Sequence, residues 1–146
     1  MLSLHDPARR AALESRIRAL TPDSARQWGR MTPDQMLRHI NQALDINLGR
    51  IPVKIMFLPM PRAWVRYFAL NFQWPKGSPT APEMLARERY DFAAEQARCL
   101  AAVAETAAKP LASEWGLHPA FGKLSGEHAT TLGAKHLDYH LRQFGV

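Results

Sequence analysis

The chain has 146 residues, a length that fits a single domain with one substantial core. Hydrophobic residues make up 47% of it and charged residues 22%, which indicates a globular protein and excludes a disordered one. The net charge of +6 suggests an anionic partner, but the basic residues are scattered and form no known DNA- or RNA-binding motif, so nucleic-acid binding is not expected.

Residues 6–20 predict the first helix. Asp6 is a suitable N-cap, and Pro7 stands at the first helical position, where its missing amide hydrogen does no harm. Apolar residues then recur at helical spacing as far as Leu20. The stretch is charged almost from its beginning, so we find no secretory signal peptide in it.

The second helix has the clearest start signal in the chain. Thr32 is followed by Pro33 and by Gln35, which is the pattern of a capping box with proline at the first helical position. Gly49 is a suitable C-terminal stop. His39 belongs to the apolar stripe of this helix, so we expect its side chain to point into the protein.

The segment 50–82 contains six of the eleven prolines and predicts a long irregular connection with at most a short helix around 62–70. Its most apolar part, residues 55–72, carries two prolines and two arginines. A membrane span needs about 20 nearly uncharged residues, so no span is expected here. We expect this part to be buried in the core or in an interface with a partner.

The third long helix begins at Thr80 or nearer Asp91 and runs to about Ala107. It contains Cys99, the single cysteine, in an apolar run that favours a small buried side chain over a reactive thiol. One cysteine excludes an internal disulfide and is typical of the reducing cytosol. We therefore expect a cytoplasmic protein.

A loop is predicted for residues 113–127, and Ser125 can cap a last helix over 126–143. His118 precedes a proline in this loop, which favours an extended conformation; we interpret it as a structural residue, with a place at the mouth of a site as the alternative. Four principal helices and little strand predict an all-α fold. The expected architecture is an antiparallel four-helix bundle, one domain over residues 1–146, with a long proline-rich connection between helices two and three.

His136 and His140 are four residues apart on the last helix, so their side chains lie on one face and can reach one metal ion. Asp138 is turned away from that face by about 200° and is not expected to be a ligand. If the second and last helices are neighbours, His39 can supply a third nitrogen and leave open positions for water or substrate. The alternative is a buried His39 bonded to a backbone carbonyl and two unrelated surface histidines.

Three stretches make the chain similar to the DinB-like superfamily, in a branch that is a domain of unknown function. They are "WGRMTPDQMLRHINQAL" at 28–44, "HPAFGKLSGE" at 118–127 and "KHLDYHLRQFG" at 135–145. The resemblance covers about residues 10–146 and implies a metal-binding four-helix bundle. In it, the positions that match the family's three metal ligands are His39, His136 and His140.

The resemblance also implies a function. We expect a divalent ion, Zn²⁺ or Ni²⁺, in an enzyme that acts on a small molecule. It would be a transferase or isomerase that uses a low-molecular-weight thiol as cosubstrate, or a hydrolase, and the ion would make a bound thiol or water nucleophilic. No general base is identified. The alternative is a non-catalytic bundle, a binding or dimerisation module whose segment 55–72 docks a partner or a second copy as a homodimer.

Overall fold

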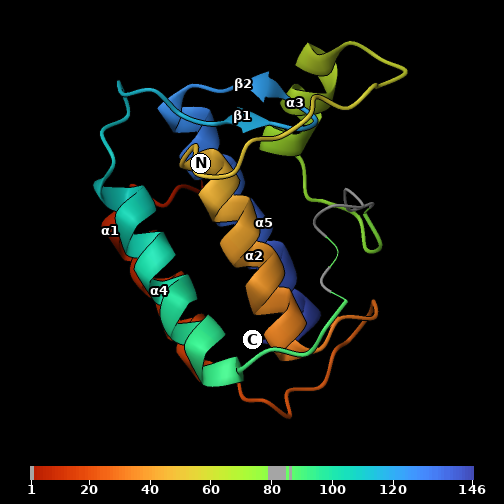
Figure 1. Ribbon diagram of the computed structural model, residues 1–146, viewed down its shortest axis with the longest axis vertical. Helices are drawn as coiled ribbons and strands as arrows, with labels where there is room; N and C mark the ends of the chain where they lie inside the picture. Colours follow the sequence, from red (N-terminus) through yellow and green to blue (C-terminus); the bar gives the residue numbers. More distant parts are fainter. Residues whose placement is uncertain (1, 79–84, 86) are drawn as a thin grey trace.

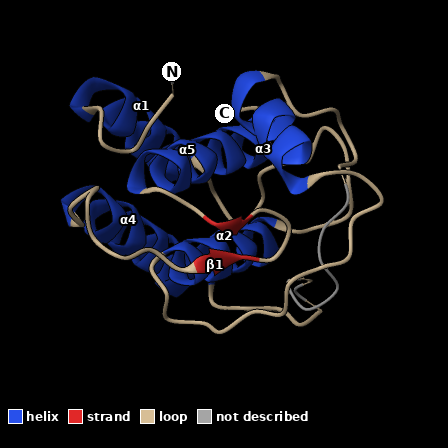
Figure 2. Ribbon diagram, turned by 90° about the horizontal axis from the view of Figure 1, so that it is seen from above, coloured by secondary structure: helices blue, strands red, loops and turns tan. Residues whose placement is uncertain are grey.

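The computed structural model describes residues 2–78, 85 and 87–146, and in this part of the chain it contains five helices and one short hairpin (Figure 1). The elements are α1 (Pro7–Ala19), α2 (Pro33–Asn47), α3 (Arg62–Asn71), α4 (Phe92–Ala108), β1 (Leu117–His118), β2 (Gly122–Lys123) and α5 (Gly126–Gln143). The expected all-α bundle is confirmed: the four long helices pack side by side, and α3 lies outside them against α5 (Figure 2).

Each long helix begins where local side-chain chemistry satisfies its free amide groups. The carboxylate of Asp6 accepts from the amide of Arg9 at 3.1 Å, and Asp91 caps α4 in the same way. The Thr32 amide donates to the side chain of Gln35 at 3.0 Å in the predicted capping box of α2. Ser125 caps α5 as expected. The third long helix therefore begins after Asp91, and the alternative start at residue 80 lies outside the described residues.

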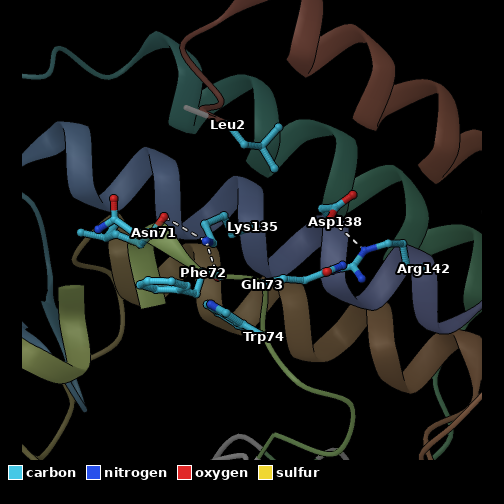
Figure 3. Close-up of a pocket in the computed structure, with 9 residues that line it drawn as sticks. Leu2, Asn71, Phe72, Gln73, Trp74, Lys135, Asp138 and Arg142 are labelled. Carbon is cyan, nitrogen blue, oxygen red and sulfur yellow. Dashed lines mark hydrogen bonds and ion pairs between the residues drawn. The ribbon is translucent and has the colours of Figure 1, made fainter. Parts of the chain in front are cut away.

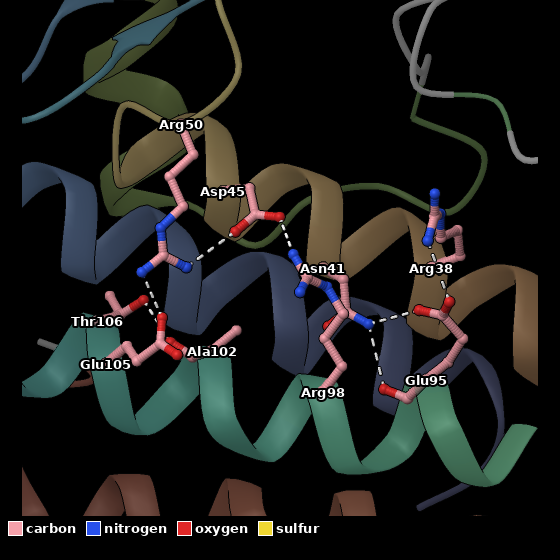
Figure 4. A network of polar contacts seen from close by, with 9 residues as sticks. All are labelled: Arg38, Asn41, Asp45, Arg50, Glu95, Arg98, Ala102, Glu105 and Thr106. Carbon is pink, nitrogen blue, oxygen red and sulfur yellow. Dashed lines mark hydrogen bonds and ion pairs between the residues drawn. The ribbon is translucent and has the colours of Figure 1, made fainter.

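Helices α2 and α4 run in the same direction, because the long connection returns the chain to the end where α2 began. Arg38 of α2 and Arg50, three residues past the end of α2, pair with Glu95 and Glu105 of α4, so residue numbers rise together along both helices (Figure 4). A proline-rich connection with a short helix was expected for this segment, and α3 is that helix.

Helices α2 and α5 run in opposite directions. His39, in the middle of α2, faces the C-terminal half of α5, whereas Asn47 at the end of α2 donates to Ala129 near the start of α5. Helices α2 and α5 are therefore neighbours, which was the condition for His39 to join the two histidines of α5. This arrangement places the histidines of α5 opposite the histidine of α2.

The core lies between the four long helices and includes Cys99, which is fully buried. Burial raises the pKa of its thiol to about 12, which agrees with a structural rather than a reactive cysteine. A second apolar cluster lies between α3, the hairpin and the first half of α5. Within the described residues no helix is both long and apolar enough to cross a membrane.

The segment predicted as a loop before α5 contains an antiparallel hairpin, in which Leu117 pairs with Lys123 and His118 with Gly122. Strands of two residues are too short to produce an alternating sequence pattern. The hairpin is attached to α2 through Gly116, whose amide donates to the Asn47 carbonyl at 2.9 Å. A β-carbon on Gly116 would lie 1.9 Å from the Ile46 carbonyl oxygen, so only glycine permits this approach.

Candidate metal centre

Three histidine side chains from two helices meet inside the bundle. His39 is 1% exposed and comes from the buried stripe of α2, as its position in the sequence predicted. His136 and His140 lie one turn apart on the facing side of α5, the first partly buried and the second buried. The structure therefore brings together the three residues that the sequence had singled out.

The three imidazoles face one another through their Nε2 atoms. Nε2 of His136 lies 2.9 Å from Nε2 of His39 and 3.1 Å from Nε2 of His140. One donor atom from each ring can be chosen so that all three lie within 4.8 Å of one another. Nitrogens bound to one tetrahedral Zn²⁺ at about 2.0–2.1 Å are separated by about 3.3 Å. Small side-chain movements would therefore let the three rings bind a single ion.

Gln143, one turn beyond His140, determines which nitrogen of His140 faces the other rings. Its side-chain amide donates to the Trp28 carbonyl at 2.9 Å, so its oxygen is left to accept from Nδ1 of His140 at 2.8 Å. Nδ1 therefore carries the proton, and Nε2 presents a lone pair to His136. Second-sphere hydrogen bonds of this kind orient metal-binding histidines.

The rings of His136 and His140 are also held in the neutral form that binds metals. Burial lowers the pKa of His140 to about 3 together with the neighbouring His39, although the hydrogen bond to Gln143 raises it. Burial, and then the nearby His39 and His140, lower the pKa of His136 well below its ordinary value. One proton on Nε2 of His136 can point to only one of its two neighbours. The lone pair on Nε2 of His140 is directed at the same group of rings, where a cation would be bound favourably.

A cavity of about 360 Å³ adjoins two of the three histidines, His136 and His140. This volume is within the range of small-molecule sites. Trp28 and Trp74, from the loops before α2 and after α3, form aromatic walls, and Arg30 lies at the edge. Sequence reasoning did not find these two tryptophans, because nothing local connects two loop residues 46 positions apart to one site.

Tyr139 supplies a hydroxyl group to the same cavity. The hydroxyl oxygen accepts from the Gly77 amide at 3.0 Å and from the indole of Trp28 at 3.4 Å. A hydroxyl group has two acceptor positions and one donor, so its own proton remains available for a ligand. In the sequence, Tyr139 lies between the two predicted ligands His136 and His140, and this was the only local signal for such a role.

His118 lies on the other side of His136, where it lines a cavity of about 20 Å³ together with Asn47 and Trp74. The amide of Ala120 donates to its Nδ1 at 3.2 Å, and burial lowers its pKa to about 4. It is extended in β1, as the following proline predicted, and its ring stacks on Phe121. His118 does not line the larger cavity beside the cluster, so its place at the mouth of a site stays a prediction.

Asp138 does not belong to the histidine cluster, as its angular position predicted. It accepts from Arg16 of α1 at 2.7 Å and from Arg142 at 2.9 Å. It lines a separate cavity of about 500 Å³ with Lys135, whose ammonium group donates to two carbonyls at the end of α3 (Figure 3). These charged groups stabilise the contacts of α5 with α1 and α3.

Comparison with known proteins gives one family. A family model described as the DinB superfamily matches residues 7–144, nearly the whole chain and all three histidines of the cluster. No curated protein and no solved structure matches the chain.

Proposed function

The chain belongs to the DinB superfamily, and on that premise we propose that it is an enzyme that binds one divalent metal ion and acts on a small molecule. His39, His136 and His140 would hold the ion, Zn²⁺ or Ni²⁺. One observation supports this proposal above all. Nε2 of His136 lies 2.9 Å from Nε2 of His39 and 3.1 Å from Nε2 of His140, and the group lies beside a cavity.

The donor set fits such an ion. Three neutral imidazoles suit Zn²⁺ and Ni²⁺, and a site with three protein ligands leaves at least one position for a substrate. Bound there, the ion would act as a Lewis acid that lowers the pKa of a coordinated water or thiol and makes it a nucleophile at neutral pH.

The residues around the cavity would bind and orient the substrate. Trp28 and Trp74 offer apolar faces to a small organic molecule, and Arg30 can attract an anionic group at the edge. The proton of the Tyr139 hydroxyl can be donated to an oxygen of the bound molecule. Together these groups fix the position of the substrate relative to the histidines.

Two kinds of reaction are candidates for this site: transfer of a low-molecular-weight thiol, or a thiol-dependent isomerisation, and hydrolysis. In each the bound ion would activate the nucleophile, because it lowers the pKa of a coordinated thiol as it does that of a coordinated water. A thiol ionises more readily than water even before it is bound, so we place thiol transfer or thiol-dependent isomerisation first and hydrolysis second.

Metal analysis of protein purified without a histidine tag tests the site directly. We expect about one Zn²⁺ or Ni²⁺ per chain in the wild type and little metal in His39→Ala or His136→Ala. His128→Ala, on the same helix but outside the cluster, is the matched control and should retain the metal. A wild type that is metal-free and takes up neither ion on dialysis would contradict the proposal.

A second experiment tests the reaction. The metal-loaded protein is incubated with glutathione or cysteine and a panel of small electrophiles, and in parallel with activated esters. Thiol consumption that stops on addition of a chelator and returns with metal is the expected result. Ester cleavage without thiol consumption would favour the hydrolase, and inactivity in both assays would leave a metal-binding protein without this chemistry.

A further inference from the structure

Helix α3 exposes a stripe of aromatic side chains to solvent. Trp64, Tyr67, Phe68 and Phe72 are each more than half exposed, with Trp64 at 63%. Tyr67 and Phe68 are adjacent, Trp64 precedes Tyr67 by three residues and Phe72 follows Phe68 by four, and the rings of the last three lie within 6.2 Å of one another, centre to centre. We call these four residues the aromatic stripe. A continuous apolar surface of this kind marks an interaction site.

The opposite side of α3 is already used for packing. Val65, Ala69 and Leu70 contact the apolar cluster beneath the helix. Arg62 donates to the Ala120 carbonyl at 2.9 Å and fixes α3 to the hairpin. The helix is thus oriented with its aromatic stripe outward, and folding of the described chain does not bury the stripe.

The segment that leads into α3 adds further apolar side chains. Ile55 and Met60 are exposed, and Phe57 is 91% exposed, more than any other large apolar residue of the described chain. Leaving such side chains in water is unfavourable by roughly 25 cal/mol for each Å² of apolar surface, so the segment gains from an apolar environment. This environment must accept aliphatic as well as aromatic side chains.

The charge of the segment indicates which kind of partner would cover these exposed apolar side chains. Residues 46–82 contain five Lys and Arg residues and no Asp or Glu. Arg50 is neutralised by Asp45 and Glu105, but the exposed Lys54 has no acidic residue close to it in the sequence, and Arg66 donates only to a backbone carbonyl. The apolar surface is therefore bordered by positive charge that α3 and its flanking segments do not neutralise.

This charge pattern argues against a second copy as the partner. In a two-fold contact through α3 the same surface would face itself, and its cations would meet cations. The same pattern of positive charge around an apolar surface suits a membrane whose headgroups are anionic. An amphipathic helix with aromatic residues on its apolar face and Lys or Arg beside them lies in the interface of such a membrane.

We propose that α3 and residues 54–61 dock on the surface of a membrane that contains anionic phospholipid. Trp64, Tyr67, Phe68 and Phe72 enter the boundary between headgroups and acyl chains, while Lys54 and Arg66 lie near the phosphates. The chain lies on the bilayer without spanning it. This inference is independent of the metal and of the reaction.

Sedimentation with lipid vesicles tests the proposal on the full-length protein. We expect binding to phosphatidylcholine vesicles that contain about a third phosphatidylserine, weaker binding when salt is raised, and little binding to pure phosphatidylcholine. The double variant Trp64→Ser/Phe68→Ser should lower the partition coefficient at least about tenfold, because two apolar anchors are lost. Leu111→Ser, which changes an exposed apolar residue elsewhere, should bind as the wild type does.

Charge reversal tests the electrostatic part. Lys54→Glu should lower binding to the anionic vesicles on the order of tenfold, whereas Arg87→Glu, outside the segment, should have a small effect. Circular dichroism and the thermal midpoint must show that all four variants are folded. The proposal is overturned by a failure to bind anionic vesicles, by equal binding to neutral ones, by dimerisation that the double variant abolishes, or by retention on single-stranded nucleic acid through the same residues.

Discussion

Gln143 orients one of the three histidines that are the candidate metal ligands. Two histidines at i and i+4 reach one ion only if both present a lone pair, and neutral imidazole has a lone pair on one nitrogen alone. The hydrogen bond between the Gln143 oxygen and Nδ1 of His140 selects the useful form. The amide of Gln143 is itself held by the Trp28 carbonyl. The loop before α2 therefore helps to determine which nitrogen of His140 carries the proton.

Replacing Gln143 with Leu should therefore weaken metal binding without unfolding the protein. Loss of a hydrogen bond that orients a ligand lowers metal affinity about 10- to 100-fold in comparable sites. Competition with a chromogenic chelator measures the affinity. Gln73→Leu, at an exposed position, should keep wild-type affinity. Equal affinities in the two variants would show that Gln143 does not orient His140.

At the scale of elements, the parallel pair α2 and α4 is joined by polar side chains over much of its length (Figure 4). The Asn41 amide donates to both the carbonyl and the carboxylate of Glu95, and Arg38 pairs with the same carboxylate at 3.2 Å. Asp45 then binds Arg98 and Arg50. Polar groups that are paired across the interface in this way favour one relative position of the two helices.

The two glutamates of this interface should differ sharply in their effect on stability. Glu95→Ala should lower the free energy of unfolding by about 2–3 kcal/mol, because the buried amide of Asn41 loses its carboxylate partner and Arg38 its charge partner. Glu105 is 47% exposed at its side chain, and Glu105→Ala should change stability by at most about 0.5 kcal/mol. Urea unfolding measures both values. Similar losses in the two variants would contradict this view of the interface.

At the scale of the whole molecule, the histidine cluster joins two helices that are far apart in the sequence. His39 precedes His136 by 97 residues, and the two belong to the antiparallel pair α2 and α5. A ligand that binds only the folded arrangement stabilises it by mass action. The metal site would therefore contribute to the stability of the bundle as well as to its chemistry.

Addition of Zn²⁺ or Ni²⁺ to chelator-treated protein should raise its thermal midpoint. At 100 times the dissociation constant the gain is about 2.7 kcal/mol, which corresponds to roughly 5–10 °C for a chain of this size. Thermal unfolding followed by circular dichroism, with and without metal, measures the shift. His39→Ala should show almost no shift, and His128→Ala the full one. A full shift in His39→Ala would place the ion elsewhere.

Local chemistry explains why the helix ends could be predicted. Asp6 and Ser125 accept from amides three residues further on, and Gln35 accepts from the amide of Thr32, so these effects can be read from short stretches of the chain. The hairpin at 117–123 could not be predicted in the same way, because its short strands depend on Gly116 fitting against the end of α2. The sequence left open whether residues 55–72 are buried in the core or in an interface, for a similar reason: both faces of α3 carry apolar residues, and only the packing beneath it shows which face is buried.

The long helices, the spacing of His136 and His140 and the inward direction of His39 follow from the order of residues alone, since each depends on the geometry of a single helix. The match to the DinB superfamily is likewise a property of the sequence. Three relations emerge only when the chain is folded: α2 faces α5, Gln143 orients His140, and Trp28, Trp74 and Tyr139 border one cavity. These relations depend on packing between residues that are distant in the chain, and no local pattern of side chains encodes such contacts.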